Sequence, residues 1–233
     1  MFWLWDPTYI FLIPGLIMVF WAQIRVKSAF NEWSQRGTRT GVTAADVARD
    51  ILDKHGITDV RVERVPGHLS DHYDPKAKVV RLSDSTYHSN SIAAIGVAAH
   101  EVGHAIQHEH SYVPLHMRNL IFPVARIGDM FGPMMVIFGF LFRSEFGMWL
   151  IDAGIIFFTL AVGFYIVTLP VEYNASSRAV AILENCGYMT SDEVRGAKKV
   201  LNAAALTYVA AAASAVMQLV RLFVIRGMAR DDD

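Results

Sequence analysis

Two histidines and a glutamate stand in the pattern His-Glu-x-x-His at His100, Glu101 and His104. If this stretch is helical, the two histidines lie about one turn apart on one face, because an α-helix has about 3.6 residues per turn. Two imidazole nitrogens placed in this way can bind one zinc ion at about 2.0–2.1 Å each. Glu101 then lies beside the metal, where it can accept a proton from a water molecule that the metal acidifies. The pattern therefore predicts the metal site of a zinc hydrolase.

The residues before this pattern favour a metal over two ordinary surface histidines. Residues 91–99 read Ser-Ile-Ala-Ala-Ile-Gly-Val-Ala-Ala, a run of small and apolar side chains that is typical of a buried helix. We expect Ser89 or Asn90 to cap the start of this helix. Buried ionisable groups are costly unless something compensates them, and a zinc ion does so. The alternative, in which the histidines and the glutamate are satisfied without a metal, stays open from this stretch alone.

The composition indicates a membrane protein. Of the 233 residues, 53% are hydrophobic and 18% are charged, and the mean hydropathy is +0.31. Soluble domains of this length are usually less apolar and more charged. The net charge of −1 gives no indication of a nucleic-acid partner. The single cysteine, Cys186, excludes an internal disulfide and a cysteine-based metal site.

Four stretches of the chain are apolar enough to cross a bilayer, for which a helix needs about 20 residues. In chain order we predict a first span (1–24), a zincin-like domain with the His-Glu-x-x-His helix (25–119), two spans (120–171), a helical segment with the third ligand (172–199), a fourth span (200–225) and a tail (226–233). The predicted fold class is therefore mainly α and integral to the membrane, with about four transmembrane helices and a small α+β cytoplasmic domain.

The first span is predicted to stay in the mature protein. Residues 8–24 carry no charge, and Trp3, Trp5 and Trp21 fit aromatic anchors at the two membrane interfaces. A cleaved signal peptide is the competing interpretation. It would want a positive N-terminus and a cleavage site with small residues, and this chain has neither.

Positive charges set the expected orientation. Four of them follow the first span and none precedes it: Arg25, Lys27, Arg36 and Arg39. Because positive charges are retained on the cytoplasmic side, the N-terminus is expected outside and the next segment in the cytoplasm. With four spans, the polar segments 25–119 and 172–199 then emerge on the same, cytoplasmic side. They can therefore build one site.

Between the first span and the metal-binding pattern we expect one helix and a β-hairpin. Thr43 and Asp46 resemble a capping box at the start of the helix, and Gly56 is a natural stop. Residues 59–65 alternate between polar and apolar, and residues 78–82 do so in part, which is typical of strands. The connection between the two strands is polar and carries aromatic residues, so we predict a hairpin with a long tip.

A catalytic zinc commonly has three protein ligands and one open position, so one ligand is missing from the pattern. His110 lies where a metzincin would have its third histidine, but that pattern needs a glycine where Gln107 stands. His108 lies about 12 Å along a helix from His100, which is too far for both to bind one ion. Glu172 ends an uncharged stretch, where a carboxylate is costly unless a cation balances it. We favour Glu172, whose alternative role is a charge at a helix start.

Several motifs together resemble the bacterial membrane-bound neutral zinc metallopeptidases of the YugP type. The resemblance covers nearly the whole chain and rests on Arg-Val-Lys-Ser at 25–28, Ser-Asp-His-Tyr-Asp-Pro at 70–75, Val-Ala-Ala-His-Glu-Val-Gly-His-Ala-Ile-Gln at 97–107, Leu-Pro-Val-Glu at 169–172 and Ala-Ala-Ala-Leu-Thr-Tyr-Val-Ala at 203–210. It implies a peptidase of the bacterial inner membrane with a Zn²⁺ cofactor, a protein or peptide substrate, and the lipid bilayer as its surroundings.

A more distant resemblance concerns the third ligand. The HtpX-type membrane proteases are gluzincins, whose third ligand is the glutamate of a Glu-aromatic-x-Ala-Asp motif. Residues 172–176 match that motif except at the last position, where Ser176 replaces the aspartate. The resemblance therefore implies Glu172 as the third ligand. The exchange at Ser176 affects the group that would support the metal ligands.

The predicted activity is hydrolysis of a peptide bond, with Glu101 as the general base. Residues 78–82 are expected to offer a strand edge to an extended substrate. His72, Tyr73 and Arg178 are the candidates for contacts with the substrate or its oxyanion, and the sequence does not choose among them. The alternative is a zinc-containing membrane scaffold or adaptor with little proteolytic activity. A scaffold has no need of Glu101.

Overall fold

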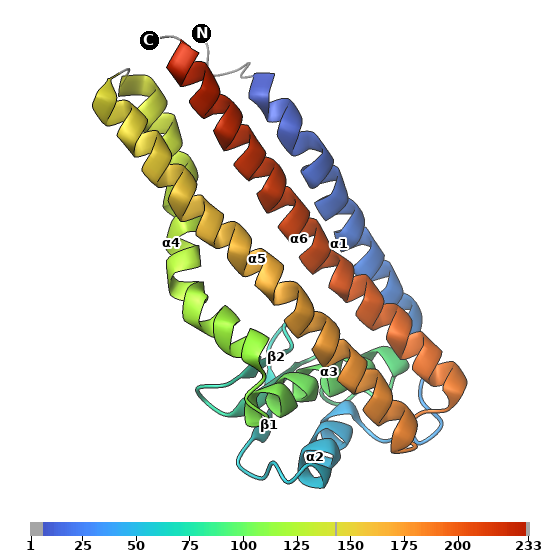
Figure 1. Cartoon of the computed structure of the whole chain (residues 1–233). Helices are drawn as coiled ribbons and strands as arrows, with labels where there is room; N and C mark the ends of the chain where they lie inside the picture. The colour runs from blue at the N-terminus through green and yellow to red at the C-terminus, as the bar shows by residue number, and fades with distance from the viewer. Residues whose placement is uncertain (1–6, 143, 232–233) are drawn as a thin grey trace. The chain divides into compact units, whose positions relative to one another are not determined.

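The computed structural model of the chain describes residues 7–142 and 144–231, which are mainly helical and carry a three-stranded sheet (Figure 1). The predicted anchors Trp3 and Trp5 lie outside the described residues. The chain divides into two compact units. The bundle unit comprises the described residues of Met1–Ala22, His116–Leu169 and Thr207–Asp233, and the site unit comprises Gln23–Leu115 and Pro170–Leu206.

Four helices in the described part are long and apolar enough to span a membrane, as predicted. They are the short η2 continuing into α1 (Pro7–Leu12 and Ile13–Ser34), α4 (Val113–Phe142), α5 (Glu145–Asn185) and α6 (Ser191–Asp231). Helices α5 and α6 are each 41 residues long, so both continue well past their apolar stretches. The segment predicted at 172–199 therefore consists of the end of α5, a turn and the start of α6. Gly187 forms that turn with a φ of 71°.

Close approach of two backbones holds α4 and α5 together within the bundle unit. A Cβ atom added at Gly139 would lie 2.5 Å from the carbonyl oxygen of Gly147, and one added at Gly132 would lie 2.8 Å from that of Gly154. No side chain fits into these gaps without moving the backbone. Small residues are the usual means by which apolar helices pack closely in a bilayer.

The site unit is built on helices α2 (Ala44–Lys54) and α3 (Ile92–Glu109), which bury their apolar faces in one core. Helix α2 begins as predicted, because the Thr43 hydroxyl accepts a hydrogen bond from the backbone N–H of Asp46. The cap of α3 is Ser91, whose Oγ accepts from the Ala94 N–H at 3.2 Å. The expectation of Ser89 or Asn90 was wrong by one or two positions.

The sheet comprises β1 (Arg61–Val65), β2 (His72–Asp74) and β3 (Val79–Ser83), in the order β1-β3-β2. The predicted hairpin was wrong, because β1 and β3 pair in parallel rather than antiparallel. The chain must return to the same end of the sheet between them. It does so through β2, which pairs with β3 antiparallel inside the predicted loop. Strand β3 is therefore central and paired on both sides, so the expectation that residues 78–82 offer a free edge was also wrong.

Side-chain hydrogen bonds, rather than an apolar pattern, hold strand β2 in the sheet. The Asp71 carboxylate accepts from the backbone N–H and the hydroxyl of Ser83, at 2.7 and 2.9 Å. The Asp74 carboxylate accepts from two backbone N–H groups in the turn that follows, both at 3.0 Å, and from Arg81 at 2.9 Å. A strand of three residues is too short to show alternation. Its presence could not be recognised from periodicity.

The register of β2 gives its side chains opposite directions. Tyr73 is paired with Val80, which is fully buried in the core shared with α3, and the Tyr73 hydroxyl lies 2.9 Å from Nδ1 of His108 on that helix. His72 is paired with Arg81 on the other face. Successive strand residues point to opposite sides of a sheet. Tyr73 therefore faces α3, and His72 faces away from it.

Candidate metal centre

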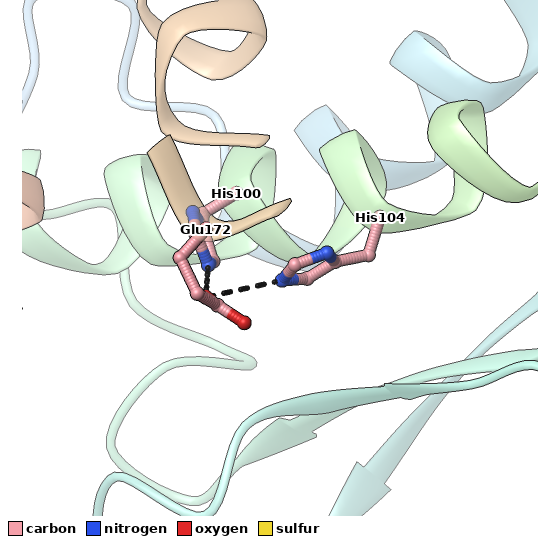
Figure 2. A group of neighbouring side chains, drawn as sticks. All are labelled: His100, His104 and Glu172. Atoms are coloured by element: carbon pink, nitrogen blue, oxygen red, sulfur yellow. Dashed lines mark ion pairs between the residues drawn. The ribbon is translucent and has the colours of Figure 1, made fainter. Parts of the chain in front are cut away.

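Three potential metal ligands from two helices of the site unit converge on one point. Among the described residues, His100, His104 and Glu172 form a group whose ligand atoms all lie within 4.8 Å of one another. The Glu172 Oε2 atom lies 3.3 Å from Nε2 of His100 and 3.5 Å from Nε2 of His104. Figure 2 shows that one ring nitrogen of each histidine faces this carboxylate. Helix α3 supplies the histidines one turn apart, and α5 supplies the glutamate.

These distances fit a zinc ion better than a simple ion pair. Two ligand atoms about 2.0–2.2 Å from a tetrahedral zinc are about 3.3–3.5 Å from each other. A charge-assisted hydrogen bond between nitrogen and oxygen would be shorter, at about 2.7–2.9 Å. The observed separations of 3.3 and 3.5 Å match the first geometry. Two imidazoles and a carboxylate are also the ligand set of many catalytic zinc sites.

A glycine on α3 allows the two helices to come close enough for this group to form. A Cβ atom added at Gly103 would lie 2.8 Å from the carbonyl oxygen of Ala175 on α5. Gly103 immediately precedes His104, and Ala175 lies within one turn of Glu172. The contact therefore fixes the separation of the two helices directly at the candidate ligands.

We expect Gly103→Ala to push α3 away from α5, because the neighbour is backbone and cannot rotate aside. Overpacking of this kind typically costs about 1–3 kcal/mol. The variant should show a lower melting temperature and reduced zinc content. Gly163→Ala is the matched control, since nothing lies within 4 Å of a Cβ atom there. Equal melting temperatures and zinc contents in the two variants would contradict the close contact.

The nitrogen of each histidine that faces away from Glu172 also has a partner. Nδ1 of His104 lies 3.0 Å from Oε1 of Gln107, and Nδ1 of His100 lies 3.1 Å from Oγ of Ser176. Such partners orient metal-binding imidazoles. Ser176, the residue at the last position of the motif at 172–176, therefore contacts His100. Sequence reasoning missed Gln107, although its position three residues after His104 places it on the same helix face.

The residues around His104 shift the pKa of its imidazole. Burial disfavours the charged form of the ring, but the hydrogen bond and the charge of Glu172 outweigh burial, so the pKa of His104 is raised. Zinc binds the neutral imidazole and must displace this proton.

We expect the zinc affinity of the protein to fall on acidification. Below the pKa of His104 the fall should be about tenfold per pH unit for each proton displaced. Because that pKa is raised, the fall should begin at a higher pH than for an ordinary histidine. Chelator competition between about pH 8 and pH 6 measures this, and a constant affinity would contradict it.

The general base predicted from the sequence lies on α3 beside the first histidine. Glu101 is buried, with 9% of its surface exposed. It lies on the same helix as both histidines, adjacent in sequence to His100. Its carboxylate contributes to the electrostatic stabilisation of protonated His104. Glu101 is therefore near enough to the group to influence its charge.

The other predicted residues have different places in the site unit. Tyr73 faces α3 and its pKa is raised to about 12, mainly by burial and also by nearby carboxylates. Its hydroxyl therefore stays protonated at neutral pH and can donate a hydrogen bond. Arg178 lies on α5, with its Nε donating to Oδ1 of Asn174 at 2.8 Å. His72 is exposed on the far face of the sheet, and the structure does not bring it to the group.

The two alternative third ligands do not join this group. His108 contacts Tyr73, as described above, and His110 is the C-cap of α3. Neither belongs to the group of ligand atoms found among the described residues. Glu172 is buried, with 2% of its surface exposed.

Comparison with known proteins identifies the family. The family described as "Putative neutral zinc metallopeptidase" matches residues 8–227. The chain is also 48% identical over 226 residues to the "Putative membrane protease YugP" of Bacillus subtilis (strain 168), a match that covers 97% of this chain and 99% of that protein. No solved structure matches the chain. With a family match across almost its whole length and a candidate zinc site within it, the chain belongs to this family of neutral zinc metallopeptidases.

Proposed function

We propose that the protein is a zinc-dependent endopeptidase of the gluzincin type, embedded in the bacterial inner membrane. The observation that carries the proposal is the distance of the Glu172 carboxylate from the two imidazoles, because its separations of 3.3 and 3.5 Å from Nε2 of His100 and Nε2 of His104 are those expected for ligands of a tetrahedral zinc. These three residues would hold the ion. When bound, zinc supplies Lewis acidity toward a peptide carbonyl and acidifies a water molecule.

Glu101 performs the proton transfers in this mechanism. Its carboxylate accepts a proton from the attacking water and delivers it to the leaving amine, as a general base and then a general acid. Glu101 is 9% exposed. The two histidines of the motif would bind the ion and would take no part in the proton transfer.

The substrate is proposed to bind as an extended strand along β2. This strand pairs only with β3 in the described sheet, so its outer edge has backbone groups available for a further strand. Strand β2 also contacts α3, the helix that carries the histidines. Tyr73 on this strand faces α3 with a protonated hydroxyl. Tyr73 and Arg178 are our candidates for stabilising the oxyanion, whereas His72 lies on the other face of the sheet.

The membrane orientation is proposed from the positive charges that follow the first span. We expect Gly67 and Gly187 both to face the cytoplasm, in agreement with an active site on that side. Cysteines introduced at these positions, after native Cys186 is replaced, should not react with a membrane-impermeant reagent added to intact cells. A cysteine introduced near the predicted outer end, at Ser144, should react. Labelling at Gly67 or Gly187 would overturn the orientation.

A direct test combines metal content with activity. The purified protein should contain about one zinc per chain and should cleave casein or a membrane-derived peptide, and a chelator should remove both properties until zinc is restored. The competing function is a zinc-containing membrane scaffold with little proteolysis. It predicts zinc without cleavage, so stoichiometric zinc in a protein that cleaves neither substrate would favour the scaffold.

A further inference from the structure

Gln107 is a fully buried amide whose every hydrogen-bonding group has a partner in the site unit. Its exposed fraction is 0%. Its Oε1 lies 3.0 Å from Nδ1 of His104, and its Nε2 donates to the carbonyl oxygen of Val171 at 2.8 Å and to Oδ1 of Asn174 at 3.0 Å. The amide nitrogen therefore donates both of its hydrogens to residues of α5, and the amide oxygen faces His104 on α3, the helix that carries Gln107 itself.

Groups of fixed polarity determine which way this amide points. The Val171 carbonyl can only accept a hydrogen bond, so the atom of Gln107 facing it must be the nitrogen. The Nε–H of Arg178 can only donate, so the atom of Asn174 at 2.8 Å from it must be the oxygen. That oxygen then accepts from Gln107 as well. The Val171 carbonyl and the Arg178 guanidinium therefore require the same orientation of the Gln107 amide.

This orientation has a consequence for His104. Since the amide oxygen of Gln107 can only accept, the Nδ1 atom of His104 must carry a proton. In the neutral imidazole the lone pair is then on Nε2, the atom that lies 3.5 Å from Glu172 Oε2. His100 differs, because the Ser176 hydroxyl can rotate and either donate or accept. Only His104 is held in one tautomer by groups that cannot adapt.

We propose that Gln107 is a positioning residue that fixes His104 in the Nδ1–H tautomer and so presents Nε2 to the metal, with Asn174 and Arg178 holding the amide in place. The inference deepens the proposed function and rests on it. Partners of this kind commonly contribute about 10–100-fold to metal affinity. In this chain an amide takes the place of the carboxylate that often supports a metal-binding histidine.

Two substitutions at Gln107 separate positioning from packing. Gln107→Met loses all three hydrogen bonds. Gln107→Glu keeps an oxygen that accepts from His104, and because its other oxygen faces the acceptors of Val171 and Asn174, that oxygen must carry a proton and donate to one of them. We expect Gln107→Met to lower zinc affinity about 10–100-fold, measured by chelator competition, and Gln107→Glu to recover most of the loss. If Gln107 only packs α3 against α5, both variants lose affinity equally, and the proposal is wrong.

Two controls keep the result interpretable. Gln218→Met makes the same change in α6 of the bundle unit and should leave zinc affinity unchanged. In the zinc-free wild type with ¹⁵N-labelled histidine, at a pH at which the imidazole is neutral, NMR should find the His104 proton on Nδ1, which tests the tautomer even if a Gln107 variant does not fold. A proton on Nε2 would overturn the inference. Failure of the wild type to bind zinc would instead refute the proposed function.

Discussion

Glu101→Gln is expected to reduce peptide hydrolysis by several orders of magnitude while the protein keeps its zinc. Glutamine has nearly the same shape as glutamate but cannot accept and deliver the proton of the attacking water. General acid–base catalysis alone typically contributes roughly 10²–10⁴-fold. Zinc content should not change, because the ligand atoms belong to His100, His104 and Glu172.

The measurement compares cleavage rates and zinc content of the purified variant and the wild type. Glu109→Gln is the matched control, since it makes the same chemical change on the same helix at an exposed position. It should leave cleavage nearly intact. Cleavage at the wild-type rate in Glu101→Gln would refute the mechanism. If the wild-type protein binds zinc but hydrolyses no peptide, the result would favour the scaffold function.

Local signals in the sequence were sufficient to predict that the helices exist, although the start of α3 was placed one or two residues too early. The membrane-spanning candidates follow from mainly apolar stretches of about 20 residues, and the start of α2 follows from Thr43 and Asp46 three positions later. The position of the histidines on one face follows from the pitch of a helix. In each case the residues that determine the structure lie within a few positions of one another, so the pattern can be recognised without knowing the fold.

The sheet could not be predicted in the same way, because its pairing depends on residues that are distant in sequence. Strand β2 is held by Asp71 bonded to Ser83, 12 positions away, and alternation in β1 and β3 is equally compatible with parallel or antiparallel pairing. The same limit applies to the partner of His104. Gln107 is next to the motif, but its orientation depends on Val171, 64 positions later.

Glu172→Ala is expected to lower zinc affinity by at least the roughly 10–100-fold that changes in supporting residues cause, because it removes a direct ligand. The carboxylate oxygen lies 3.3 and 3.5 Å from the two imidazole nitrogens, and two histidines alone leave zinc one protein ligand short of the usual three. The end of α3 and the middle of α5 meet where Gly103 permits close contact. Among the described residues, the group of potential ligands contains no further histidine, cysteine or carboxylate that could replace Glu172.

The comparison variants are His108→Ala and His110→Ala, which should leave zinc affinity nearly unchanged. His108 uses Nδ1 to contact Tyr73, and His110 ends helix α3. Chelator competition gives the affinities, and circular dichroism establishes that each variant retains its helices. Loss of zinc in His110→Ala together with full retention in Glu172→Ala would mean that a histidine completes the site. The gluzincin assignment would then be wrong, since it depends on a glutamate from a second helix reaching the two histidines of the first.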